Sequence, residues 1–253
     1  MQIKLSLYGK LLLLALSLEA ILGIVLVFGF SAFNKQNDRD KFRHAETLLL
    51  QCYHYRAEFA KKRDMNIKDK FAKNIKAFDN IINPFLDDDS VVQIDFLKSE
   101  YEKEFYRYVR LMEERGINEN LGIEGNFRNR VHEVEDIIKT IGSYRIYTDM
   151  LQARRSEKDF IMRRKDMYIT RVENAVSSLI KNTKSLGISD ERKREIINLS
   201  KAYINSFYSI VEIFQSLDSS SEHLSMLENR LQNHIEEVVV EEAEKAEMSQ
   251  NFQ

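Results

Sequence analysis

Glycine, proline, tryptophan and cysteine are scarce in this sequence, and each shortage excludes a class of fold. Among 253 residues there are 8 glycines and 1 proline, too few for the many tight turns of a sandwich or barrel built from short strands. The single cysteine, Cys52, excludes an internal disulfide framework. Charged residues make up 31% of the chain, which suits long helices with one solvated face. We therefore expect an all-α fold.

Neither sign of charge is in clear excess. The 38 Lys and Arg residues against 40 Asp and Glu residues leave a formal net charge of -2, so no global field favours nucleic acid as a partner. The sequence also lacks a nucleophile elbow, a phosphate-binding loop and a cluster of metal ligands. His132 and Glu135 stand three positions apart, but two ligands do not make a metal site. We expect no enzymatic activity, no catalytic residues, and no metal or other cofactor.

The longest apolar run covers residues 11–33, where Glu19 is the only ionisable group. At about 1.5 Å per residue this run spans about 34 Å, enough to cross the hydrocarbon core of a bilayer. It is too long for a signal peptide and lacks a clear cleavage site, which favours an uncleaved transmembrane helix. Residues 1–10 carry Lys4 and Lys10 and no acid, so we expect this tail in the cytoplasm. The chain is then expected to be anchored in the cell (inner) membrane, with residues 34–253 extracytoplasmic.

The extracytoplasmic region has the apolar spacing of packed helices. Apolar residues recur at steps of three and four, for example at Phe71, Ile75 and Phe78, and each series forms one stripe along a helix. Helix breaks are expected at four places: Asn83-Pro84, Arg115-Gly116, residues 186–190 and residues 218–221. Ser189 and Ser221 are the expected N-caps after the last two breaks. These signals predict about eight helical segments, arranged as two four-helix layers.

An internal resemblance favours two modules. Leu50-Gln51 recurs as Leu151-Gln152, and Lys62-Arg63 recurs as Arg163-Arg164, all 101 positions apart. After a slip of one residue, Asp64-Met65 matches Asp166-Met167. A duplication would end one helix of each module on basic residues and begin the next after a capping Asp. A chance match between two helical sequences is the alternative.

Two stretches resemble a known sensor family: GINENLGIEGNFRNRVHEVE at 116–135 and MLQARRSEKDFIMR at 150–163. They resemble the helical bimodular sensor domain of methyl-accepting chemotaxis proteins. This resemblance implies six helices, two of them long, in a membrane-proximal and a membrane-distal four-helix bundle. It also implies a chemoreceptor sensor that binds small organic acids and works as a homodimer. Members of that family continue into a second membrane helix and a cytoplasmic signalling region. The expectation of a signalling output for this chain therefore comes only from the resemblance.

A small carboxylate ligand would need arginines, because guanidinium pairs with carboxylate through a planar fork and stays charged. Four positions after Arg154 the sequence has Lys158, which is not an acid, whereas four positions after Arg155 it has the acid Asp159. We expect inward-facing arginines without an acid partner to keep a place for the anion. Simple pairs with acids three or four positions away are the alternative. The candidate ligand-binding residues are Arg56, Arg63, Arg128, Arg154, Arg155 and Arg230, with Arg56, Arg128, Arg154 and Arg230 as first choices.

Other residues of the second motif and several tyrosines have plainer interpretations. Glu157, Lys158 and Asp159 are interpreted as a structural network, and Phe160 as core. Three tyrosines, at positions 144, 147 and 168, either line a pocket or pack with a wet hydroxyl. Two other functions stay open: a membrane-anchored helical scaffold or coiled coil, and the sensor region of a histidine kinase or another transmembrane signalling protein.

Overall fold

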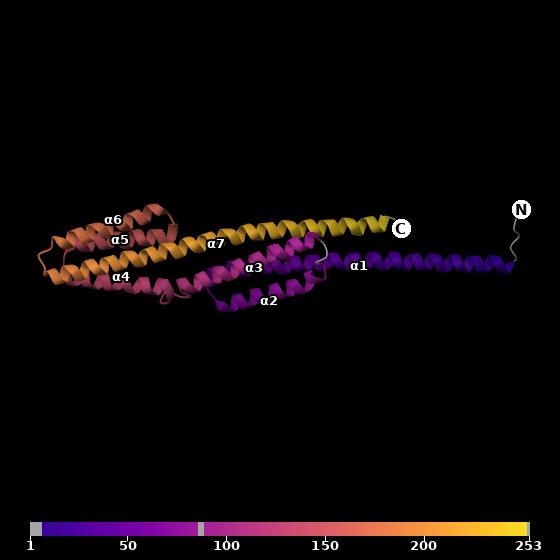
Figure 1. Cartoon of the computed structure of the whole chain (residues 1–253), viewed down its shortest axis with the longest axis horizontal. Helices are drawn as coiled ribbons and strands as arrows, with labels where there is room; N and C mark the ends of the chain where they lie inside the picture. Colours follow the sequence, from indigo (N-terminus) through magenta and orange to yellow (C-terminus); the bar gives the residue numbers. More distant parts are fainter. Residues whose placement is uncertain (1–6, 86–88, 252–253) are drawn as a thin grey trace. The chain divides into compact units, whose positions relative to one another are not determined.

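The computed structural model describes residues 7–85 and 89–251, and within them the side chains of residues 22, 23, 37–85, 89–244 and 248. All regular structure in this part is helical, so the expected all-α class is confirmed (Figure 1). The elements are α1 (Leu7–Lys62), α2 (Met65–Ile82), the short 3-10 helix η1 (Asn83–Phe85), α3 (Asp89–Arg115), α4 (Gly122–Ile141), α5 (Tyr144–Arg163), α6 (Asp166–Lys184) and α7 (Asp190–Asn251).

The described part holds seven α-helices, rather than the eight segments expected from the breaks or the six implied by the resemblance. The expected break at residues 218–221 and the cap at Ser221 are wrong, because α7 runs unbroken for 62 residues. The hydroxyl of Ser220 is buried and donates to the Glu104 carboxylate, so it does not compete for the helix backbone. Ser189 is an N-cap as expected, since its Oγ accepts the backbone N–H of Arg192 at 3.3 Å.

The expected transmembrane helix at residues 11–33 lies almost wholly outside the described side chains. The backbone there belongs to α1, but the side chains of residues 1–21 and 24–36 are not described. Within the described residues, no helix has a stretch both long and apolar enough to cross a bilayer. The anchor therefore stays a prediction from the sequence.

The chain divides into two compact units. The first unit contains Met1–Lys61, Met65–Lys103 and Ser225–Gln253, and the second contains Lys62–Asp64 and Glu104–Leu224. Helices α3 and α7 contribute residues to both units. Each unit has its own apolar core.

Aromatic and aliphatic side chains from α1, α2, α3 and α7 form the core of the first unit. Tyr101 of α3 lies at its centre, with its ring 5.4 Å from that of Tyr53 and 5.7 Å from that of Phe71. Lys98 is also buried, and its Nζ lies 2.7 Å from the Asp79 carboxylate and 3.1 Å from that of Asp95. The apolar stripe of α2 is fully inside, as its spacing predicts: Ile67, Phe71, Ile75, Phe78 and Ile82 are all buried.

The core of the second unit joins α3, α4, α5, α6 and α7. Phe127 of α4 stacks on Tyr203 of α7 at 5.7 Å between ring centroids, and it also contacts Phe207. Phe160 of α5, expected in the core, is buried against Phe207 in an edge-on contact at 5.6 Å. α5 and α6 pack along each other as a hairpin with a two-residue link (Figure 1).

The backbone repeats the internal resemblance seen in the sequence. α1 ends at Lys62 and α5 at Arg163, and the next residue in each case, Arg63 or Arg164, has a left-handed backbone with φ of 54°. The slip of one residue is not needed, because the buried positions of α2 and α6 keep the 101-residue spacing through Phe71 and Val172. Asp does not cap both helices, however. Lys165 precedes α6, and Asp166 lies inside its first turn, where it still favours the helix dipole.

Candidate functional site

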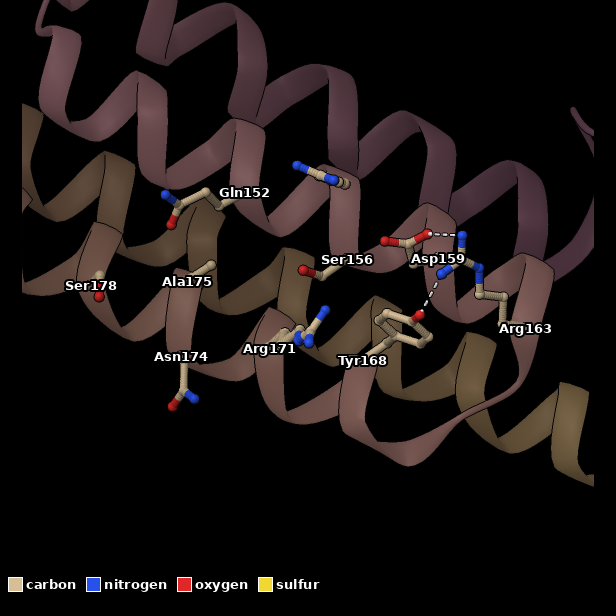
Figure 2. A pocket seen from close by; sticks show the side chains of 10 residues that line it. Gln152, Ser156, Asp159, Arg163, Tyr168, Arg171, Asn174, Ala175 and Ser178 are labelled. Atoms are coloured by element: carbon tan, nitrogen blue, oxygen red, sulfur yellow. Dashed lines mark hydrogen bonds and ion pairs between the residues drawn. The ribbon is translucent and has the colours of Figure 1, made fainter.

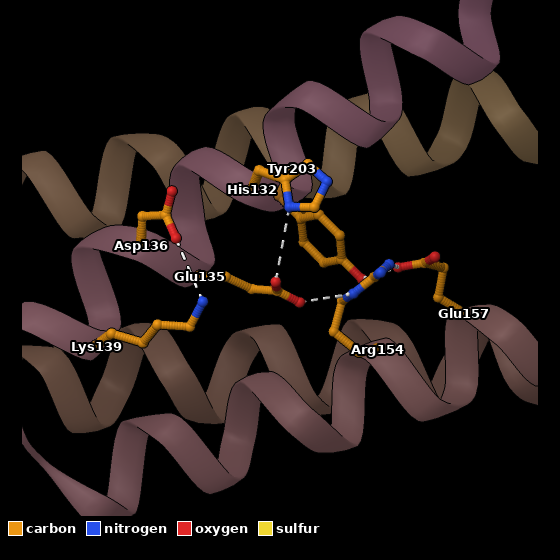
Figure 3. A network of polar contacts seen from close by, with 7 residues as sticks. All are labelled: His132, Glu135, Asp136, Lys139, Arg154, Glu157 and Tyr203. Atoms are coloured by element: carbon orange, nitrogen blue, oxygen red, sulfur yellow. Dashed lines mark hydrogen bonds and ion pairs between the residues drawn. The ribbon is translucent and has the colours of Figure 1, made fainter. Parts of the chain in front are cut away.

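Arg154 lies between two carboxylates in the second unit (Figure 3). Its Nε donates to Glu135 of α4 at 3.0 Å, and its Nη1 donates to Glu157 of α5. The hydroxyl of Tyr203 of α7 donates to the same Glu157 oxygen at 3.0 Å. Burial raises the pKa of Tyr203 well above its usual value, and the Glu157 charge raises it further, so this hydroxyl keeps its proton. The interpretation of Arg154 as an unpaired arginine is therefore wrong, while the expected structural role of Glu157 agrees with these contacts.

A similar network lies in the first unit around Arg56. Its guanidinium binds Glu228 of α7 through two bonds, Nε to Oε1 at 3.0 Å and Nη2 to Oε2 at 2.6 Å. Tyr101 donates its hydroxyl proton to Glu228 at 3.0 Å. Burial is again the first cause that raises the pKa of Tyr101 far above its usual value. Arg56 was expected to lack an acid partner, and this is wrong because the acid comes from a helix far away in the sequence.

The other two first-choice arginines, Arg128 and Arg230, do not face the interior of a helical bundle. Arg128 is half exposed, and its Nη1 lies 3.6 Å from the exposed carboxylate of Glu119. Arg230 is also exposed on α7. Arg63 lies past the end of α1, where its Nη1 donates to the Gly116 carbonyl at 2.9 Å. The premise that Arg128 and Arg230 point inward is wrong, because the apolar stripes of α4 and α7 face other directions.

Arg155 lines a groove of about 570 Å³ between α5 and α6, here called the α5–α6 groove (Figure 2). Its walls are the facing sides of the hairpin, and most of the lining side chains are polar. The lining residues are Gln152, Arg155, Ser156, Asp159 and Arg163 from α5, and Tyr168, Arg171, Asn174, Ala175 and Ser178 from α6.

Positive charge exceeds negative charge in the α5–α6 groove. Asp159 is its one carboxylate, and it pairs with Arg163 at 3.7 Å instead of with Arg155 as the sequence spacing suggested. Arg163 also donates to the Tyr168 hydroxyl at 2.7 Å, and this hydrogen bond is the first cause that raises the pKa of the arginine. Within the described side chains, neither Arg155 nor Arg171 forms an ion pair with a carboxylate. The groove thus offers two guanidinium groups to an anion.

Sequence reasoning missed Arg171. The signal was present: a short link at residues 164–165 makes a hairpin, and residues at similar distances before and after such a link face one another. Tyr168, one of the proposed pocket tyrosines, does line the groove. Tyr144 and Tyr147 line a different pocket of about 320 Å³ at the turn between α4 and α5.

The described residues contain no cluster of three side chains able to hold a metal ion. Cys52 is fully buried, and burial first and the nearby Glu102 charge second raise the pKa of its thiol to about 12. A thiol with so high a pKa is a poor nucleophile at neutral pH. The α5–α6 groove is therefore the arrangement with the clearest binding chemistry among these residues.

Comparison with known proteins adds no relative to this description. No protein-family model, no curated protein sequence and no solved structure matches the chain.

Proposed function

We propose that residues 34–253 form the extracytoplasmic sensor region of a transmembrane chemoreceptor and bind a small organic acid in the α5–α6 groove. The observation that carries this proposal is the pair Arg155 and Arg171, which line one groove without a carboxylate partner in the described part of the chain. A carboxylate ligand would bring the negative charge that this hairpin lacks.

The groove suits a small anion for further physical reasons. Arg163 and Asp159 are already bound to each other, so they shape the wall and leave the other two guanidinium groups for the ligand. Amides and hydroxyls at positions 152, 156, 174 and 178 could hydrogen-bond the remaining polar atoms of an organic acid. A mostly polar groove also fits a short, hydrophilic acid better than a fatty acid.

A route from the groove to α7 follows from two contacts of the hairpin. Tyr203 of α7 donates to Glu157 of α5 at 3.0 Å, and Tyr208 of α7 donates to Glu173 of α6 at 2.9 Å. A ligand that draws α5 and α6 together would favour one arrangement of these contacts over another. A small displacement of α7 along its axis is the kind of signal that such a sensor passes on.

The finer architecture and setting belong to the same proposal. The resemblance at 116–135 and 150–163 implies tandem four-helix bundles that share long helices, and the division into two units with α7 in both supports this arrangement. We propose residues 11–33 as the membrane anchor, residues 1–10 as cytoplasmic, and a homodimer as the working form. The sensor region of a histidine kinase would have the same ligand chemistry and a different output.

The direct test measures carboxylate binding to the full chain purified in detergent. Acetate, succinate and their neutral amides are compared by thermal shift and calorimetry. A carboxylate should raise the melting temperature, and Arg155→Gln or Arg171→Gln should weaken its affinity by about 10–100-fold. Arg128→Gln and Arg230→Gln are matched controls, because both arginines are exposed and lie outside the groove. Equal responses to amides and acids, or unchanged affinity in the Arg155/Arg171 double variant, would refute the proposal.

A scaffold without a ligand is the second candidate, and the 62-residue length of α7 favours it. In that case no carboxylate would change the melting temperature, while cross-linking of cysteine pairs along α7 would still trap a parallel dimer. The two candidates therefore differ in the calorimetric result.

A further inference from the structure

The second unit contains a separate cluster of three arginines, Arg63, Arg115 and Arg164, here called the arginine cluster. Two of them, Arg115 and Arg164, lie over the ring of Phe214 of α7, which is 2% exposed. The guanidinium carbon of Arg164 lies 3.4 Å from the centroid of the Phe214 ring, and that of Arg115 lies 4.4 Å away. Arg63 and Arg115 both donate hydrogen bonds to Glu124.

These three arginines form ion pairs with only two carboxylates among the described residues. A single oxygen, Oε2 of Glu124, accepts both Arg63 Nη1 at 3.0 Å and Arg115 Nε at 3.1 Å. Asp218 is the other acid, and its carboxylate lies 3.6 Å from Arg164 Nε. Three guanidinium groups and two carboxylates leave one positive charge in excess. Burial first, and then a neighbouring arginine, lower the pKa of both Arg115 and Arg164.

The arginine cluster also has unused donors at a partly open surface. The side chains of Arg115, Arg63 and Arg164 are 14%, 19% and 32% exposed. In the described part of the chain, no hydrogen bond uses the Nη2 group of any of the three. Each of the three arginines therefore keeps one donor group that none of these hydrogen bonds uses.

The backbone conformation adds to this picture. Arg63 and Arg164 follow α1 and α5 with φ of 54°, a left-handed conformation that glycine adopts most easily. Both positions carry the long cationic side chain of arginine, although glycine would fit this backbone conformation better. The Arg164 side chain turns back to the Phe160 carbonyl at the end of its own helix, whereas Arg63 donates to the Gly116 carbonyl just after α3.

We propose that the arginine cluster binds a tetrahedral oxyanion of the phosphate type, either a free phosphate or the phosphate group of a larger molecule. A planar carboxylate matches one guanidinium fork, whereas a phosphate presents several acceptor oxygens to donors arriving from different directions. The charge in excess and the three Nη2 groups suit such a ligand. This site shares no residue with the α5–α6 groove.

The test titrates the full chain in detergent with inorganic phosphate, using sodium chloride at matched ionic strength as the reference. Phosphate should bind at one saturable site and raise the melting temperature more than chloride does. Arg115→Gln and Arg164→Gly should each weaken phosphate binding by about tenfold or more. Arg164→Gly suits the left-handed backbone, so it separates lost binding from lost folding. Arg230→Gln, exposed on α7 and outside the arginine cluster, should leave phosphate affinity unchanged.

A second arm identifies the source of the phosphate group. The full chain is placed in phosphatidylcholine nanodiscs with and without phosphatidylglycerol, and the phosphate titration is repeated. Competition by phosphatidylglycerol assigns the cluster to a lipid headgroup, and undiminished phosphate binding assigns it to a soluble phosphate. The proposal is overturned if phosphate and chloride act alike, if neither Arg115→Gln nor Arg164→Gly changes phosphate affinity, or if Arg230→Gln abolishes it.

Discussion

Arg154 and Arg155 follow one another along α5, yet their guanidinium groups have opposite surroundings. Arg154 is 21% exposed and ion-paired with Glu135 and Glu157, whereas Arg155 is exposed and lines the α5–α6 groove. Successive residues on a helix point about 100° apart, so one of the pair reaches the helix interface and the other the groove. Arg154 should therefore matter for stability, and Arg155 for binding.

Replacing the two adjacent arginines should change the free energy of unfolding by very different amounts. Arg154→Gln leaves Glu157, whose side chain is 4% exposed, without its cation, so we expect a loss of about 2–4 kcal/mol in the free energy of unfolding. Arg155→Gln should change it by no more than about 0.5 kcal/mol. Denaturant titration followed by circular dichroism measures both. A stable Arg154→Gln variant would show that the Glu135 and Glu157 carboxylates find other partners.

Stability should fall steeply above about pH 10, the usual pKa range of tyrosine and lysine. Burial raises the pKa of Tyr101 and Tyr203, and hydrogen bonds to Asp79 and Asp95 raise that of Lys98 despite its burial. In each case the folded protein keeps a proton that the unfolded chain loses, so the free energy of unfolding decreases as pH rises. The slope should reach about 1.4 kcal/mol per pH unit for each group.

The matched control for this pH dependence is the Tyr101→Phe/Tyr203→Phe double variant, which removes two of the titrating hydroxyls. Its unfolding free energy should be lower at neutral pH by about 1–3 kcal/mol for each lost hydrogen bond to a carboxylate. Its slope above pH 10 should be shallower than that of the unchanged protein. Parallel slopes would assign the alkaline transition to other groups.

Two glycines should respond differently to a single added methyl group. A Cβ on Gly125 of α4 would lie 2.2 Å from the Asn120 carbonyl oxygen, whereas a Cβ on Gly187 would meet nothing within 4 Å. We expect Gly125→Ala to cost about 1–3 kcal/mol through this overlap, and Gly187→Ala to be neutral or slightly stabilising. Melting temperatures of the two variants check the difference. Equal behaviour would mean that the loop before α4 moves away without cost.

The Cys52 thiol should react with a thiol reagent only after unfolding. It is fully buried, and its pKa of about 12 leaves almost no thiolate at neutral pH. Labelling with a chromogenic disulfide should be slow in buffer and complete within minutes in denaturant. Rapid labelling of the folded protein would indicate local opening between α1 and α2, since Cys52 lies against the Phe71 backbone.

Local features of the sequence predicted most of the helical layout. Spacing of apolar residues placed the buried stripe of α2, and the break signals at Pro84, Gly116 and residues 186–190 agree with the ends of α2, α3 and α6. The matched basic residues around positions 62 and 163 marked two equivalent helix ends. These features depend on residues close together in the chain, so local propensity decides them.

What the sequence determined by itself is the all-α class and most helix ends; what only the tertiary structure decided is which charged residues are paired. Arg56 has its acid 172 positions away, at Glu228, and Ser220, inside the unbroken α7, donates its hydroxyl proton to Glu104, 116 positions away. Spacing along one helix cannot reveal partners on another. Only the tertiary structure likewise showed that Arg155 and Arg171 line one groove without a carboxylate partner in the described part of the chain. The free energy of an ion pair depends on distance in space and on burial.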